Sequence, residues 1–127
     1  MQLDPIGTFH CAESYPYDAA RQGSVSQDNS GAVTLISGQN FEQALQDLDG
    51  FSHLWLVYHF NQNPNWKPMV HPPRANRKVG VFATRAPYRP NPIGLSCVKL
   101  ESVQGLILHV RAHDLLNDTP ILDIKPY

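Results

Sequence analysis

The sequence predicts an all-β fold, namely a small closed or partly open β-barrel with one short helix and long loops. Eleven prolines and eight glycines interrupt the 127 residues, which favours strands and turns over long helices. Short β-branched and aromatic runs follow one another closely, as in barrels and sandwiches. The chain is 42% hydrophobic and contains no repeat or linker. We therefore expect residues 1–127 to form a single domain with a packed core.

The strongest strand signal is FSHLWLVYHF at residues 51–60. Its aromatic and β-branched side chains suit a pleated surface. Neither face of this segment is fully polar, so we expect a central strand that is covered on both sides. A first strand is expected at 1–10 and a short β-branched run at 32–36, with loops over 14–30 and 61–77. Further strands are expected at 79–84, 93–101, 106–113 and 120–125.

One helix is expected between residues 40 and 50. Asn40 suits the N-cap position, and Gln43 stands three residues later, as in a capping box. Gly50 supplies a C-terminal stop. Apolar residues fall at i, i+3, i+4 and i+7, which is the stripe of an amphipathic helix: Phe41, Ala44, Leu45 and Leu48.

The basic residues are concentrated in the middle of the chain. The formal net charge is −1, yet residues 51–99 contain no Asp or Glu and seven of the ten Lys and Arg residues. A local field of this kind steers anionic ligands even when the net charge is near zero. The alternative is a solvated surface on which basic residues happen to cluster.

Cys11 and Cys97 are the only cysteines, too few for a disulfide framework. Free thiols in a reducing compartment are the expected state. The N-terminal residues lack the basic-then-apolar pattern of a signal peptide, and the longest apolar run, 54–58, is too short to span a bilayer. We expect a cytoplasmic protein with no membrane segment.

The stretch RPNPIGLS at 89–96 predicts a rigid polar loop. Arg89 and Asn91 each precede a proline, which restricts their backbones. Gly94 can adopt a positive φ or let a ligand approach the backbone. Such a loop would present one guanidinium and one carboxamide as a preorganised site. A rigid β-turn with two exposed polar side chains explains the same residues.

The segments around this loop interleave arginines with aromatic residues. Arg85 and Arg89 flank Tyr88, and Trp66 and Phe82 stand nearby in the sequence. Guanidinium groups recognise phosphate through paired hydrogen bonds, and aromatic faces stack on unpaired bases. The composition is typical of single-stranded RNA binding, although aromatic residues of this kind also form protein cores.

No metal site is expected. His109 and His113 are four residues apart, but in a strand that spacing separates them by about 13 Å. The sequence has no zinc-type cysteine pair, HExxH, GxGxxG or Walker A motif. Asp114 and Asp123 are candidate general bases, and each also suits a turn cap or an ion pair with an arginine.

Four segments together resemble the TsaA-like, or TrmO, family. They are FSHLW (51–55), VHPPR (70–74), GVFATRAPYRPNPIGLS (80–96) and DLLNDTPILDIKPY (114–127). The resemblance implies a β-barrel methyltransferase that uses S-adenosylmethionine and works as a homodimer. It also implies a substrate, tRNA whose base beside the anticodon is N6-threonylcarbamoyladenosine, and methylation of the N6 nitrogen of that base.

The resemblance also implies roles for individual residues. Arg85 and Arg89 would face substrate anions, and Asn91 would bond to the base or its amide. The acceptor of the N6 proton is left open among Tyr58, Asp114 and Asp123. Cofactor contacts are implied at Arg21, Gln22, Gly23, Phe60, Asn61, Arg85, Leu95, Thr119, Pro120, Ile121 and Leu122. Two alternatives remain: a non-catalytic RNA- or nucleotide-ligand-binding barrel, and a metal-dependent hydrolase.

Overall fold

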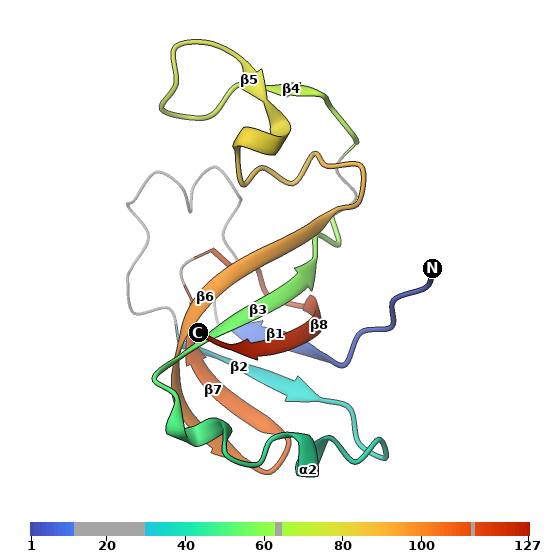
Figure 1. The fold of residues 1–127 in the computed structure, drawn as a ribbon, viewed down its shortest axis with the longest axis vertical. Coiled ribbons are helices and arrows are strands. Elements are labelled where there is room, and N and C mark those ends of the chain that lie inside the picture. The colour runs from blue at the N-terminus through green and yellow to red at the C-terminus, as the bar shows by residue number, and fades with distance from the viewer. Residues whose placement is uncertain (12–29, 63–64, 113) are drawn as a thin grey trace.

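The computed structural model describes residues 1–11, 30–62, 65–112 and 114–127, and its centre is a closed six-stranded barrel (Figure 1). The strands follow the order β1-β2-β7-β6-β3-β8, and β8 pairs back onto β1. All pairs of neighbouring strands are antiparallel. The predicted all-β barrel is confirmed, in its closed form. The strands are β1 Gly7–Cys11, β2 Ser30–Leu35, β3 His53–His59, β6 Ile93–Gln104, β7 Ile107–Arg111 and β8 Thr119–Pro126.

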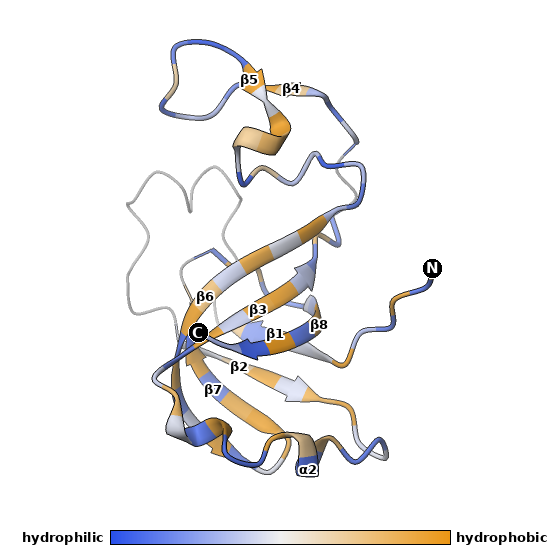
Figure 2. Ribbon diagram, in the orientation of Figure 1, coloured by the Kyte–Doolittle hydropathy of each residue, from blue (hydrophilic) through white to orange (hydrophobic). Residues whose placement is uncertain are grey.

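The core of the barrel is built by alternation along the strands. In β6 every second residue from Gly94 to Leu100 is buried, and Figure 2 shows hydrophobic and hydrophilic bands along the barrel strands. The inward-facing side chains fill the barrel interior, as expected for a barrel of this size. The largest fully buried ones are Phe9, Leu54, Leu56, Leu108 and Ile121.

Strand β3 pairs with a neighbour on each side, but only one of its two faces is buried. It lies between β6 and β8, and its residues Leu54, Leu56 and Tyr58 are buried. Residues on its other face are half-buried or exposed. The Tyr127 ring covers part of this face, because its centre lies 5.1 Å from that of the Trp55 ring. The expectation of cover on both faces was wrong, because the outer face of a closed barrel meets solvent.

The predicted helix is shorter and bent. Helix α2 covers only Phe41–Ala44, and the 3-10 turn η1 follows at Leu48–Gly50. Asn40 adopts a left-handed backbone with φ 61°, and its side chain donates to Gln43 Oε1 at 2.8 Å instead of capping a backbone N–H. Asp47, with φ 69°, separates the two turns. Three members of the expected apolar stripe, Phe41, Leu45 and Leu48, belong to or pack against the barrel core. The fourth, Ala44, is exposed.

Residues 65–92 form a lobe beyond one end of the barrel, drawn in yellow and orange in Figure 1. It contains the two-stranded sheet of β4 Met69–Val70 and β5 Val79–Gly80, followed by the 3-10 turn η2 Val81–Ala83. A second, small core holds it together: Val70, Val81 and Ala86, with Tyr88 packed against them.

Two expectations for the lobe were wrong. The strand expected at 79–84 ends after two residues, because the chain turns through η2 and leaves Phe82 exposed. The segment expected to be loop at 61–77 contains β4, since Met69 and Val70 pair with Gly80 and Val79.

The remaining boundaries differ by a few residues. Strand β1 begins at Gly7, not at residue 1, and β6 continues to Gln104. Neither Cys11 nor Cys97 forms a disulfide, as expected. Among the described residues, no helix has the length and apolar character needed to cross a membrane.

Candidate active site

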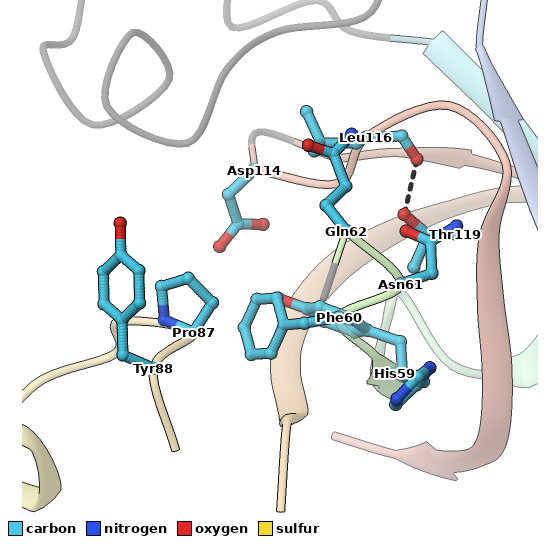
Figure 3. A pocket seen from close by; sticks show the side chains of 10 residues that line it. His59, Phe60, Asn61, Gln62, Pro87, Tyr88, Asp114, Leu116 and Thr119 are labelled. Carbon is cyan, nitrogen blue, oxygen red and sulfur yellow. Dashed lines mark hydrogen bonds between the residues drawn. The ribbon is translucent and has the colours of Figure 1, made fainter. Parts of the chain in front are cut away.

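A cleft of about 300 Å³ opens between the barrel end and the lobe (Figure 3). The barrel supplies the end of β3 and the turn that precedes β8, and the lobe supplies Pro87 and Tyr88. Figure 3 shows the Asp114 carboxylate pointing into the space between the Tyr88 and Phe60 rings. The cleft is lined by Tyr58, His59, Phe60, Asn61, Gln62, Pro87, Tyr88, Asp114, Leu116 and Thr119. We call it the Phe60 cleft.

A second cleft, of about 280 Å³, shares three wall residues with the first: Tyr58, Phe60 and Asp114. Its other walls come from the start of β6 and from the arginines of the lobe. We call it the Arg85 cleft; it is lined by Trp55, Tyr58, Phe60, Thr84, Arg85, Arg89, Ile93, Gly94, Leu95 and Asp114. The two clefts therefore meet at one set of side chains.

A hydrogen-bonded chain links these shared residues to the interior. The Tyr58 hydroxyl lies 2.9 Å from Ser96 Oγ, and Ser96 Oγ donates to Asp114 Oδ1 at 2.9 Å. Ser96 is 2% exposed and is one of two buried polar residues in the described chain. A buried hydroxyl bonded on both sides fixes the orientation of both partners. These two hydrogen bonds thus fix the position of the Asp114 carboxylate relative to the barrel.

Sequence reasoning missed Ser96, although a signal existed. Ser96 stands at an inward position of the alternating strand β6, between Gly94 and Val98. A hydroxyl at such a position needs a partner, and this requirement marks it as a candidate.

Gly94 makes room for a neighbouring side chain. Its φ is not positive, and it lies opposite Tyr58 in the β3–β6 register. A Cβ at this position would lie 2.4 Å from the Tyr58 ring. The absence of a side chain makes room for the Tyr58 ring, and the expected positive φ was wrong. Gly94 also lines the Arg85 cleft, so the approach of a ligand to its backbone stays a prediction.

Arg85 lies at the rim of the Arg85 cleft, beside Asp114 at the outer end of the hydrogen-bonded chain. Its guanidinium donates to the Leu95 carbonyl, and Nη2 lies 3.9 Å from Asp114 Oδ2. Both side chains are about half exposed, at 58% and 44%, so solvent screens this pair strongly. Arg85 and Leu95 therefore lie together at the Arg85 cleft, and the cofactor contacts that the resemblance implies for them stay a prediction.

Arg89 folds back onto its own loop. Its Nη1 donates to the carbonyls of Thr84, Ala86 and Val81 at 2.8, 3.2 and 3.3 Å. Its guanidinium carbon also lies 5.7 Å from the centre of the Phe82 ring. Asn91, beyond it, is exposed and lines neither cleft. The Arg89 side chain thus braces the loop over residues 81–89, and Arg89 also contributes to a wall of the Arg85 cleft.

The turn before β8 is fixed by side chains of the candidate site. Asn61 Nδ2 donates to the Asp118 carbonyl at 3.0 Å. Thr119 Oγ1 donates to the Leu116 carbonyl at 2.6 Å, the dashed line in Figure 3. Asp118 adopts a positive φ of 67° in this turn. Asn61 and Thr119 both line the Phe60 cleft.

Several sequence-derived candidates lie elsewhere. The side chain of Ile121 is fully buried in the barrel core, while Pro120 and Leu122 line neither cleft. Asp123 also lines neither cleft, and its Oδ2 is paired with Lys125 Nζ at 2.9 Å. Arg21, Gln22 and Gly23 lie outside the described residues. No group of three or more potential metal ligands occurs in the part of the chain that the structure describes.

Comparisons with known proteins agree with this geometry. The tRNA-methyltransferase O N-terminal domain family model matches residues 8–127. The chain is 45% identical to a probable S-adenosyl-L-methionine-binding protein from Pyrococcus abyssi, over 97% of this chain and 66% of the relative. It is 39% identical to the tRNA (adenine(37)-N6)-methyltransferase of Escherichia coli, over 100% of this chain and 57% of that enzyme.

Solved structures give the same result. A crystal structure of TrmO superimposes with a TM-score of 0.80 at 36% identity, covering 100% of this chain and 57% of that one. The chain thus spans less than two thirds of the length of these relatives. Fold, motifs and family model coincide over residues 8–127, and the chain belongs to the tRNA-methyltransferase O N-terminal domain family.

Proposed function

We propose that this chain is the barrel of an S-adenosylmethionine-dependent tRNA methyltransferase. The proposed reaction transfers a methyl group to N6 of threonylcarbamoyladenosine beside the anticodon. One observation carries the site assignment: two clefts meet at Tyr58, Phe60 and Asp114, where a buried hydroxyl fixes the carboxylate. Two adjoining clefts suit a reaction that brings two ligands together.

The residues of the Phe60 cleft fit the proposed cofactor. S-adenosylmethionine carries a sulfonium cation and a purine ring. The faces of Phe60 and Tyr88 suit stacking and cation–π contact, and the Asp114 carboxylate complements a positive charge. The volume of about 300 Å³ falls at the lower end of small-molecule sites. In this proposal Asn61 and Thr119 hold the turn against which the cofactor lies.

The Arg85 cleft suits the anionic part of the substrate. The threonyl group of the modified base ends in a carboxylate, and an arginine recognises a carboxylate through paired hydrogen bonds. Arg85 is exposed at the rim, whereas Arg89 Nη1 is bonded to carbonyls of its own loop. We therefore assign Arg85 to the anion and Arg89 to the loop that positions it.

Asp114 is the best-placed group to accept the N6 proton. The cofactor, when bound, supplies an electrophilic methyl group, so the protein needs to position the nitrogen and accept its proton. The Asp114 carboxylate faces both clefts, while Tyr58 is buried and bonded to Ser96. Asp123 is paired with Lys125 and lines neither cleft.

We also propose that the protein acts as a homodimer and that a tRNA substrate places the reaction in the cytoplasm. Sedimentation of the purified protein tests the first part. A monomeric mass at assay concentration, with full activity, contradicts it.

The central experiment is mass spectrometry of tRNA incubated with the protein and a cofactor labelled at its methyl group. The expected product is a labelled methyl on the threonylcarbamoylated adenosine. Absence of label on tRNA that carries the modification, from a folded protein that binds both ligands, would support the alternative of a non-catalytic binding barrel. Adding a chelator is expected to leave transfer unchanged, and a loss would favour a metal-dependent reaction.

A further inference from the structure

The lobe contains a groove that is separate from the two clefts. Its volume is about 300 Å³, and its floor is apolar, built from residues such as Met69, Val70 and Pro72. Lys67, His71 and Lys78 lie around that floor. Among the residues that the structure describes, none that the resemblance implies as a cofactor contact lines this groove. We call it the lobe groove.

The charge of the lobe is strongly one-sided. Residues 65–92 contain six Lys and Arg residues and no Asp or Glu. Arg89 is committed to carbonyls of its own loop, and Arg85 lies at the Arg85 cleft. Lys67, Arg77 and Lys78 are exposed, and none of the three forms an ion pair within the described chain. Exposed cations that lack carboxylate partners hold counterions, and a polyanion displaces them favourably.

The lobe groove adjoins both clefts through shared walls. Tyr88 lines the lobe groove and the Phe60 cleft, and Thr84 lines the lobe groove and the Arg85 cleft. Lys67 Nζ lies 4.5 Å from the centre of the Tyr88 ring. An RNA strand whose base enters the clefts therefore has the cations of the lobe groove beside it, on the other side of the Tyr88 ring.

Exposed aromatic rings accompany this charge. Trp66 is 50% exposed and Phe82 is 74% exposed, and their rings stack with centroids 6.4 Å apart. Large aromatic side chains outside the core serve single-stranded nucleic acid as stacking surfaces, because every base has a π-face. A paired helix offers no free base faces, so this combination favours an unpaired strand.

We propose that the lobe is the RNA-docking element, with the lobe groove holding phosphates that neighbour the base in the clefts. The inference rests on the proposed function and specifies which surface holds the tRNA. Its occupant is the single-stranded anticodon loop. Lys67 and Lys78 neutralise phosphates, and Trp66 and Phe82 stack on adjacent bases.

The test is fluorescence anisotropy with a labelled anticodon stem-loop RNA, titrated at several salt concentrations. The variant is Lys67→Ala with Lys78→Ala. The matched control is Lys99→Ala with Lys125→Ala, which removes the same charge from exposed positions on the barrel. Each lost phosphate contact lowers the salt slope by about 0.7 for single strands. We expect the lobe variant to lose about tenfold in affinity at low salt, and its slope to fall by about 1.4.

Two further measurements separate this inference from the proposed function. Titration with S-adenosylmethionine should give the same affinity for both double variants, because neither changes a cleft residue. A paired RNA duplex should bind the unchanged protein more weakly than the stem-loop. Equal losses of RNA affinity in both double variants, or no loss in either, overturn the lobe inference. Methyl transfer by the unchanged protein then still supports the proposed function. Tighter binding of the duplex overturns the single-strand assignment.

Discussion

The hydroxyls of Tyr58 and Ser96 lie 2.9 Å apart at the barrel end, and the same Ser96 oxygen donates to Asp114. One buried side chain thus connects strand β3, strand β6 and the segment before β8. No segment of the sequence alone indicates this connection, because its three members come from distant positions.

Substitution of Ser96 by alanine tests whether the hydroxyl positions Asp114. It leaves the Tyr58 hydroxyl without this partner, and we expect the free energy of unfolding to fall by about 1–3 kcal/mol. Misplacement of a reacting group costs about ten- to hundredfold in rate, so kcat should fall while KM for the cofactor changes little. Denaturant unfolding and steady-state kinetics give both values. Ser102→Ala, on the same strand, is the control, and equal effects from the two changes would contradict the positioning role.

Substitution of Gly94 by alanine tests the packing against Tyr58. The added Cβ would lie 2.4 Å from the ring, and overpacking of this kind costs about 1–3 kcal/mol. Gly80→Ala is the matched control, because nothing lies within 4 Å of a Cβ there. Thermal unfolding should show a lower Tm for the Gly94 variant only. An unchanged Tm at Gly94 would mean that the Tyr58 ring moves freely.

Replacement of Phe60 by leucine tests the aromatic wall of the Phe60 cleft. Loss of the ring removes about 0.5–2 kcal/mol of cation–π attraction, so cofactor affinity should weaken by up to about tenfold in calorimetric titration. Phe51→Leu removes a 43% exposed ring from outside the clefts and should leave affinity unchanged. Full affinity in the Phe60 variant would place the sulfonium elsewhere.

Replacement of Arg89 by alanine or lysine separates a loop brace from an anion contact. Arg89 bonds to three carbonyls of its loop, and an ammonium group does not reproduce the planar guanidinium. We expect both variants to show faster amide exchange across residues 81–89 and reduced methyl transfer. Arg77→Ala should leave exchange in that segment unchanged. Normal exchange with lost transfer would restore Arg89 as a direct substrate contact.

Local patterns in the sequence predict the barrel and much of the site. The aromatic and β-branched content of residues 51–60 predicts strand β3, but it leaves open which face points inward. In β6 the sequence does not reveal the inward face, because Ile93 and Leu95 are exposed while Gly94 and Ser96 are buried. Glycine, proline and asparagine mark the turns. The resemblance implies cofactor contacts at Phe60, Asn61, Arg85, Leu95 and Thr119, and these contacts stay a prediction; the structure places Phe60 in both clefts, Asn61 and Thr119 in the Phe60 cleft, and Arg85 and Leu95 in the Arg85 cleft.

Other features depend on contacts between distant segments, and sequence patterns do not reveal them. The return of the Arg89 guanidinium to its own loop follows from the turn at η2, which was expected to be a strand. Gly94 was interpreted through its own backbone, but its partner is the Tyr58 ring across the sheet. The helix expected at 40–50 is reduced to one short helix and a 3-10 turn because Asn40 and Asp47 adopt left-handed backbones, although Phe41, Leu45 and Leu48 still contact the core.

The position of β8 in the barrel has a consequence for biosynthesis. This strand, Thr119–Pro126, lies between β1 and β3 and pairs with both. As the chain leaves the ribosome, the other five strands emerge first, and β1 and β3 each keep one unpaired edge until β8 follows. Unpaired edges are the usual starting points of aggregation, so the interval before β8 emerges is when a nascent chain of this fold most needs a chaperone.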